Sequence, residues 1–201
     1  MRILIVGASG TIGRAVVAAL KGRHDLILTS KNEAPEQVDI GDPASIRALY
    51  ARVGRIDAVV SAAGLAAFKP LDELTDADFA LSLNNKLMGQ VNLVRLGIAS
   101  VADGGSFTLT AGSLAREPAR NAAAVSLVNA GLEGFARSAA LELPRGQRIN
   151  AVSPPFLSET LRALGRDPSA GLPAADAARA YVASVEGKQT GTVLDPRELR
   201  S

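Results

Sequence analysis

Short apolar runs alternate along the chain with longer stretches in which apolar residues recur at helical spacing. The apolar runs predict strands over residues 3–6, 26–29, 37–39, 56–60, 106–110, 148–152 and 191–194. The stretches between them predict helices over residues 12–21, 44–52, 76–100, 122–141 and 174–186. Strands that alternate with helices in this way are typical of a parallel sheet with helices on both faces. The pattern predicts a doubly wound, Rossmann-type α/β fold of about seven strands, forming one domain over residues 1–201.

The connection between the second and third predicted strands is unusually short. Residues 30–36 fill it, whereas a right-handed crossover through a helix needs more than about 10–12 residues. We therefore expect a loop in place of that helix. Residues 156–172, which contain Pro168, are expected to be irregular or to form a short helix.

The first predicted strand runs directly into Gly7-Ala8-Ser9-Gly10-Thr11-Ile12-Gly13, and an alanine-rich helical stretch follows. A buried strand that turns through glycines into a helix is the fingerprint of dinucleotide binding. Glycines let the backbone approach a pyrophosphate, and the free N–H groups of the helix N-terminus hold the anion. This context favours a nucleotide site over a purely structural turn.

Composition narrows the classes of function. The 201 residues include 22 basic and 20 acidic side chains, a net charge of +2, so we expect no nucleic-acid partner. The chain has no cysteine and one histidine, His24, which argues against a multi-histidine or thiolate metal site. Met1 and Arg2 lead straight into a strand, and no apolar run approaches the roughly 20 residues that span a bilayer. We expect a cytoplasmic protein without a membrane partner.

Five segments, taken in order, resemble the short-chain dehydrogenase/reductase family over nearly the whole chain. They are the glycine turn, Val38-Asp39-Ile40, Ser61-Ala62-Ala63-Gly64, Ser153-Pro154-Pro155-Phe156-Leu157 and the closing segment 187–193. The resemblance implies a nicotinamide dinucleotide laid across the carboxyl ends of the strands. The residues expected to bind it are Gly7, Ser9, Gly10, Thr11, Ile12, Ser30, Lys31, Asn32, Asp39, Ile40, Ala62, Ala63, Gly64, Asn129, Pro154 and Leu157.

The end of the second strand favours NADP(H) over NAD(H). A carboxylate at this position usually binds the ribose 2′-hydroxyl of NAD, but here Ser30, Lys31 and Asn32 follow the strand. A hydroxyl, an ammonium and an amide suit the extra phosphate of NADP(H). A solvated polar turn would have the same composition, and Glu33 close by argues for NAD(H).

The family's catalytic Tyr-x-x-x-Lys pair is missing. Ala130-Gly131-Leu132 matches the residues that follow the family's lysine, which puts Asn129 at the lysine position and Val125 at the tyrosine position. By the same comparison Lys86 occupies the position of the family's asparagine. Ser113 comes one residue after the position of its serine. The resemblance therefore implies Lys86, Ser113 and Asn129 as candidate catalytic residues, with lysine and asparagine exchanged between two helices that face each other.

Each candidate also has a structural interpretation. Ser82, Lys86 and Gln90 are four residues apart and would form one polar stripe on a solvated helix face. Ser113 could be an ordinary loop serine, and Asn129 a polar residue on a mostly apolar helix.

Tyr50 and Tyr181 are expected to be packing residues, although Tyr181 could reach the substrate side if its helix folds over. His24 is expected to be exposed, at the end of the sheet away from the cofactor. Arg116 and Arg120 could recognise an anionic group, but ordinary loop charges are the expected interpretation.

Three functions are consistent with the sequence. The first is an atypical NADP(H)-dependent oxidoreductase that transfers hydride to a carbonyl or similar small acceptor. The second is a non-catalytic NADP(H) sensor. The third is a reductase of flavin- or quinone-type acceptors, which need no side-chain acid. The family resemblance also implies a homodimer or homotetramer formed through the helices over 76–100 and 122–141.

Overall fold

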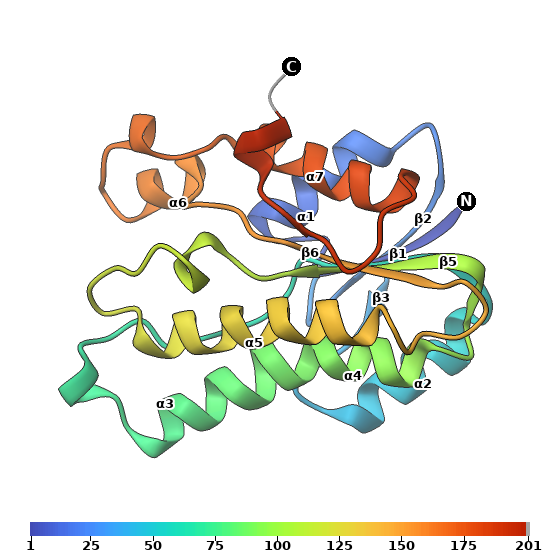
Figure 1. The fold of residues 1–201 in the computed structure, drawn as a ribbon, viewed down its shortest axis with the longest axis horizontal. Coiled ribbons are helices and arrows are strands. Elements are labelled where there is room, and N and C mark those ends of the chain that lie inside the picture. The colour runs from blue at the N-terminus through green and yellow to red at the C-terminus, as the bar shows by residue number, and fades with distance from the viewer. Residues whose placement is uncertain (200–201) are drawn as a thin grey trace.

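Parallel strands form one twisted sheet in the centre of the computed structural model, which describes residues 1–199 (Figure 1). In this part of the chain the order of the seven strands is β3-β2-β1-β4-β5-β6-β7. Their bounds are β1 Arg2–Val6, β2 Asp25–Ser30, β3 Glu36–Gln37, β4 Ile56–Ser61, β5 Val101–Thr110, β6 Arg148–Val152 and β7 Val193–Leu194. The chain runs outward in opposite directions from β1 and β4. Ligands of doubly wound folds bind at such a switch point, beyond the carboxyl ends of the strands.

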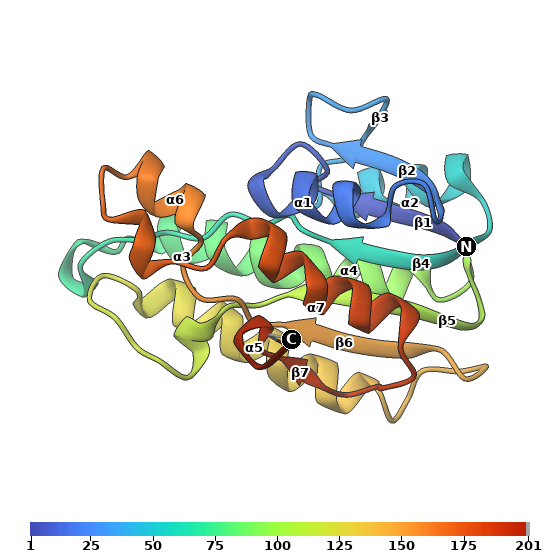
Figure 2. The same cartoon turned by 90° about the horizontal axis from the view of Figure 1, so that it is seen from above.

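Helices cover both faces of the sheet (Figures 1 and 2). α1 Thr11–Leu20 and α7 Ala174–Glu186 lie on one face; α2 Pro43–Val53, α4 Met88–Gly97 and α5 Ala123–Ala139 lie on the other. Side chains alternate along β1, so Ile3 and Ile5 pack on the first face and Leu4 and Val6 on the second. The near-continuous apolar strands that the sequence shows are thus explained by a sheet buried on both sides.

The predicted fold class is confirmed, and so is the missing helix. β2 and β3 are joined by residues 31–35 without any helix. The segment 156–172 contains the short helix α6 Ser158–Ala163, as expected, and a 3-10 turn at Pro168–Ala170. α6 lies beside the carboxyl ends of the strands (Figure 1).

The single helix predicted over 76–100 is wrong in two respects. It is divided into α3 Asp76–Leu81, a π-helical turn at Ser82–Leu87 and α4, and it ends at Gly97. An apolar repeat cannot reveal a π-turn, which inserts one extra residue per turn and often marks a functional site. Within residues 1–199, no helix combines the length and apolar character that crossing a membrane would require.

Candidate active site

Gly7 and Gly13 are required by the fold of the glycine turn. Gly7 has φ of +88°, and a Cβ there would lie 2.7 Å from the carbonyl oxygen of Ala62. Its amide donates to the carbonyl of Thr29 at 2.9 Å, which ties the turn to β2. A Cβ at Gly13 would overlap the carbonyl oxygen of Gly7. The sequence therefore uses both glycines to pack α1 tightly against the end of β1.

Gly10 is different, because the fold leaves space around it. It is exposed, and a Cβ at this position would lie 3.3 Å from the carbonyl oxygen of Gly7 and 4.0 Å from that of Ala62. It is the N-cap of α1, and no side chain caps this helix. Unpaired N–H groups at the positive end of the helix dipole attract anions. Ser9, Thr11 and Ile12, which are also predicted to bind the cofactor, flank Gly10 at the start of α1.

A first cavity of about 190 Å³ lies beside the glycine turn. Its lining combines several predicted cofactor residues with others; the full set is Val6, Gly7, Lys31, Val38, Asp39, Ile40, Ala63, Gly64, Leu65 and Asn85. Asn85 was missed by the sequence comparison, although it precedes Lys86. Its Oδ1 accepts a hydrogen bond from the amide of Leu65 at 2.8 Å and so holds the loop after β4.

The residues after β2 differ in what they offer a ligand. Lys31 Nζ lies 2.7 Å from a carboxylate oxygen of Asp39, and both side chains are partly exposed. The hydrogen bond from Lys31 lowers the pKa of Asp39. Ser30 is buried, and its Oγ accepts a hydrogen bond from the amide of Glu33 at 2.8 Å. The Ser30 hydroxyl therefore holds the turn, while Lys31 and Asn32 remain exposed.

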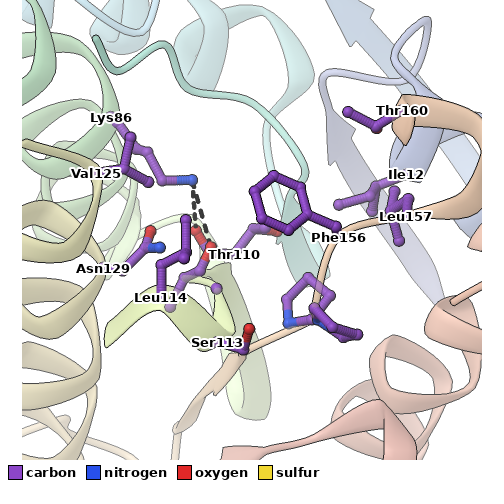
Figure 3. Close-up of a pocket in the computed structure, with 14 residues that line it drawn as sticks. Ile12, Lys86, Thr110, Ser113, Leu114, Val125, Asn129, Phe156, Leu157 and Thr160 are labelled. Carbon is purple, nitrogen blue, oxygen red and sulfur yellow. Dashed lines mark hydrogen bonds between the residues drawn. The ribbon is translucent and has the colours of Figure 1, made fainter. Parts of the chain in front are cut away.

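A second cavity of about 210 Å³ opens at the carboxyl ends of β5 and β6 (Figure 3). Among the predicted residues it brings together Ile12, Lys86, Ser113, Asn129, Pro154 and Leu157. The remaining lining is mostly apolar and consists of Thr110, Ala111, Gly112, Leu114, Val125, Pro155, Phe156 and Thr160. Residues from five separate parts of the chain thus meet where the family resemblance predicts the nicotinamide.

Lys86 lies in the π-turn and directs its ammonium group into this cavity (Figure 3). Nζ is 3.4 Å from the carbonyl oxygens of Thr110 and of Ala111. The side-chain stem fills the space that a Cβ on Gly64 would take, 2.9 Å from Lys86 Cγ. Burial lowers the pKa of Lys86 to about 8. Within residues 1–199, no carboxylate lies within ion-pair distance of this lysine.

The polar stripe on this helix faces the interior, so the interpretation as a solvated face is wrong. Ser82 and Gln90 are fully buried. Gln90 Nε2 donates to the carbonyl of Thr110 at 2.9 Å and to that of Lys86 at 3.2 Å. Gln90 Oε1 accepts a hydrogen bond from the amide of Thr110 at 2.8 Å. The side chain of Gln90 thereby fixes the π-turn to the end of β5, a role that residue spacing alone could not distinguish from solvation.

The side chain of Asn129 occupies the space beside Gly112 that a larger residue at position 112 would need. Asn129 is 2% exposed, and its Oδ1 has no hydrogen-bond partner in the described part of the chain. A Cβ at position 112 would lie 2.7 Å from Asn129 Nδ2. A serine at that position would therefore collide with the amide of Asn129. One turn before Asn129, Val125 contributes only an apolar side chain to the cavity.

Ser113 has a backbone role as well as a place in the cavity. Its amide donates to the carbonyl oxygen of Pro154 at 2.9 Å, which joins the loop after β5 to the loop after β6. Arg116, further along the same loop, lies 3.6 Å from both Glu133 and Asp195. These contacts pair the half-exposed Arg116 with two buried carboxylates, and Arg116 is not part of the cavity lining.

The tyrosines and the histidine lie outside the cavity. Both tyrosine side chains are buried: Tyr50 donates to the carbonyl of Leu93 at 2.6 Å, and the hydroxyl of Tyr181 lies 2.8 Å from Thr110 Oγ1. Their predicted packing roles are confirmed. His24 was expected to be exposed, which is wrong. Its side chain is only 12% exposed because Nε2 lies 2.7 Å from Glu186 of α7.

Comparison with known proteins identifies relatives of this chain and solved structures with the same fold. A family model described as enoyl-(acyl carrier protein) reductase matches residues 11–187. The crystal structure of the protein lin1944 from Listeria innocua is 44% identical, with a TM-score of 0.94, and the match covers 97% of this chain and 98% of that one. A small-chain dehydrogenase crystallised in complex with NADPH is 24% identical, with a TM-score of 0.86, over 97% of this chain and 95% of that chain. This last likeness shows the fold.

Curated relatives extend beyond the matched region. The short-chain dehydrogenase/reductase prx4 of Penicillium rubens is 28% identical over 175 residues, which are 76% of this chain and 53% of the relative. The chain spans about half the length of these curated relatives. With a parallel seven-stranded sheet, the glycine turn and a family match over most of its length, the chain belongs to the short-chain dehydrogenase/reductase family.

Proposed function

We propose that the chain is an NADP(H)-dependent oxidoreductase that reduces a carbonyl or similar small electrophile with an altered catalytic set. The observation that carries this proposal is the placement of Lys86. Its ammonium group lies in the second cavity, beside Asn129. This cavity opens at the carboxyl ends of the strands, the same edge of the sheet at which the glycine turn lies. A reducing site needs a hydride donor and a source of protons close together, and this arrangement supports both.

The residues present fit a dinucleotide. Gly10 and the uncapped N-terminus of α1 suit the pyrophosphate, and the cavity beside Asp39 and Ile40 suits the adenosine. Lys31 and Asn32 would meet the 2′-phosphate of NADP(H). The unpartnered Oδ1 of Asn129 would accept a hydrogen bond from a ribose hydroxyl. When bound, the nicotinamide supplies a hydride to an acceptor in the second cavity.

Lys86 would supply the proton that a tyrosine supplies in other members of the family. Its pKa of about 8 allows the ammonium to donate a proton from Nζ to a substrate oxygen near neutral pH. Ser113, on the loop after β5, would orient that oxygen. Val125 of α5 has no proton to donate. Proton transfer would therefore fall to Lys86, in the π-turn that packs against α5. This exchange keeps an ammonium close to where the family has one.

The experiment is an acceptor screen that follows NADPH oxidation with carbonyl, quinone and flavin compounds. On any acceptor found, Lys86→Met should lower turnover by about 10²-fold or more, the usual contribution of a proton donor. Lys86→Arg should not restore it, because guanidinium does not release its proton. Wild-type turnover should fall as the pH rises through about 8, since the donor must be protonated.

Lys69→Met is the matched control, because this lysine pairs with Asp78 at the surface and is absent from the cavity lining. Unchanged turnover in Lys86→Met would remove this lysine from the mechanism. A screen with no NADPH oxidation would support the non-catalytic sensor instead.

The apolar lining favours a second candidate within the same class. Val125, Phe156 and Leu157 surround the cavity with hydrocarbon. Flavin- or quinone-type acceptors have flat apolar rings and take hydride without a side-chain acid. Activity on these acceptors that survives Lys86→Met would assign this reaction to the chain.

We also propose a homodimer or homotetramer formed through residues 76–100, which include α3 and α4, and residues 122–141, which include α5. Leu81 of α3, Met88 of α4 and Leu127 of α5 are 39–50% exposed. Apolar side chains gathered on neighbouring helices often belong to an interface between subunits.

A further inference from the structure

Lys86 differs from every other lysine of the chain in its surroundings. The sequence has four more, Lys21, Lys31, Lys69 and Lys188, and all four are exposed. Lys31 and Lys69 also pair with carboxylates, at 2.7 and 2.9 Å. Lys86 alone is half-buried, with its amine at the wall of an apolar cavity.

We propose that Lys86 is a nucleophile that forms an imine with small apolar aldehydes entering the second cavity. This chemistry uses the nitrogen as a bond-forming atom and needs no nicotinamide cofactor. It therefore goes beyond the proton transfer assigned to the same side chain above.

The hydrogen bonds of Lys86 prepare its nitrogen for attack. A neutral amine has two N–H groups and one lone pair. The carbonyl oxygens of Thr110 and Ala111, each 3.4 Å from Nζ, can accept both N–H groups. Carbonyl oxygens are acceptors only, so neither can occupy the lone pair. These two contacts therefore leave the lone pair of the neutral amine unoccupied. Nζ itself points into the cavity (Figure 3).

The stem of the side chain is held in place. Lys86 Cγ and Cα pack against Gly64, at 2.9 and 3.1 Å from where its Cβ would be. Gln90 fixes the carbonyl of Lys86 and the end of β5 together. An amine on a constrained stem loses less conformational entropy in reaching a fixed electrophile.

The electrostatics of the cavity favour the neutral amine. Of the 14 residues that line it, all within residues 1–199, Lys86 is the only one with a titratable side chain. The lining residues from α1, α5, the β5 loop and the segment before α6 provide no carboxylate to hold the ammonium. Desolvation without an ion pair is the condition under which lysines become nucleophiles in proteins.

The reaction balances without a further reagent. The Nζ lone pair attacks the aldehyde carbon, and the carbonyl oxygen takes a proton to give a carbinolamine. The C–O bond then breaks as that oxygen leaves as water with a second proton. One amine and one aldehyde thus give one imine and one water, with no change of oxidation state.

The lining also defines the class of aldehyde. A volume of about 210 Å³ admits a small molecule only. Ile12, Leu114, Val125 and Phe156 present hydrocarbon to it and would leave several substrate hydroxyls unpaired. Small aliphatic aldehydes fit these walls, whereas polyhydroxylated ones do not.

The test is reductive trapping of the wild-type protein with butanal and a low concentration of cyanoborohydride at pH 7, without nicotinamide cofactor. Peptide mass mapping over time gives a butylation rate for each lysine. With a pKa of about 8, Lys86 has a roughly hundredfold larger unprotonated fraction than an ordinary lysine. We expect it to react about tenfold or more faster than the four exposed lysines, and to prefer butanal to glyceraldehyde.

Variants and controls make the test selective. Intact Lys86→Met protein should lose the fast phase of butylation, and Lys188→Arg should keep it. The α-amino group of Met1 is scored separately, because an α-amine is also alkylated under these conditions. Butylation of Lys86 at or below the rate of the exposed lysines would overturn the proposal. NADPH oxidation is measured independently, so either proposal can fail without the other.

Discussion

At the scale of single residues, Lys86 is held in its cavity at a cost in stability. An ammonium group loses hydration when it is buried, and no carboxylate among residues 1–199 offsets that loss. The lowered pKa of about 8 is the measure of this cost. Residues that destabilise the fold and line a cavity are characteristic of functional sites.

A stability measurement follows from this cost. Lys86→Met removes the buried charge, so its free energy of unfolding at pH 7 should exceed that of the wild type by about 1–3 kcal/mol. Between pH 8 and 10.5 the unfolded wild type binds more protons than the folded one. The wild type therefore gains stability as the pH rises through this window, and the difference should shrink. Urea unfolding across pH 7 to 10.5 measures it.

Lys188→Met, an exposed change of the same kind, should show no such dependence on pH. A difference for Lys86→Met that is absent, or that stays constant from pH 7 to 10.5, would contradict the burial of this ammonium.

Residue identities predicted some members of the site and not others. Lys86 and Asn129 could be found because the family's lysine and asparagine are exchanged between two predicted helices. Gln90 could not be assigned, since a buried polar stripe and a solvated one have the same spacing. The need for glycine at position 112 could not be predicted either, because it depends on the side-chain amide of Asn129, which lies directly beside it.

At the scale of elements, the strands and most helices could be predicted because each has one dominant period. The helix α7 has the predicted bounds, Ala174–Glu186. β3 is shorter than predicted and β5 longer, because strand ends depend on pairing with neighbours rather than on local sequence. The π-turn at Ser82–Leu87 was not predicted, since it depends on packing and on the hydrogen bonds of Gln90.

The glycine turn allows fold and ligand binding to be separated by mutation. Gly10→Val should leave the fold intact, because φ of −73° at this position suits any residue and only one contact tightens. The branched side chain would nevertheless block the approach of a pyrophosphate to α1. We expect binding of NADPH to be lost, with an unchanged circular dichroism spectrum.

Gly13→Ala is the matched comparison, since its Cβ would overlap the carbonyl oxygen of Gly7. This variant should lose stability as well as binding. If Gly10→Val stays folded and binds NADPH normally, the cofactor lies elsewhere on the protein.

At the scale of the whole molecule, the sheet brings distant segments together at one edge. The glycine turn, the π-turn, the N-terminal half of α5 and the loop after β6 all meet at the carboxyl ends of the strands (Figures 1 and 2). This arrangement follows from the strand order of the sheet, which belongs to the doubly wound fold class that the sequence predicts. The detailed lining of the cavity does not follow from strand order, because it depends on side-chain packing.

Assembly can be tested on the exposed apolar residues of the two long helices. Sedimentation velocity should show a dimer or tetramer, and Leu127→Glu should shift it toward the monomer, because a charge buried at an interface is costly. Leu164→Glu changes an equally apolar and exposed residue away from these helices and should have no effect. A monomeric wild type, or a Leu127→Glu protein that assembles normally, would contradict the proposed interface.

The most direct test of the account is a calorimetric titration of the wild-type protein with NADPH and with NADH. Lys31 and Asn32 should favour NADPH by roughly tenfold to a hundredfold, because a charge-assisted hydrogen bond contributes about 1.5–3 kcal/mol. Lys31→Ala should remove most of that preference, and Lys69→Ala, the loss of another exposed paired lysine, should keep it. Equal affinity for the two cofactors, or a preference that Lys31→Ala leaves intact, would contradict the assignment of this site to NADP(H).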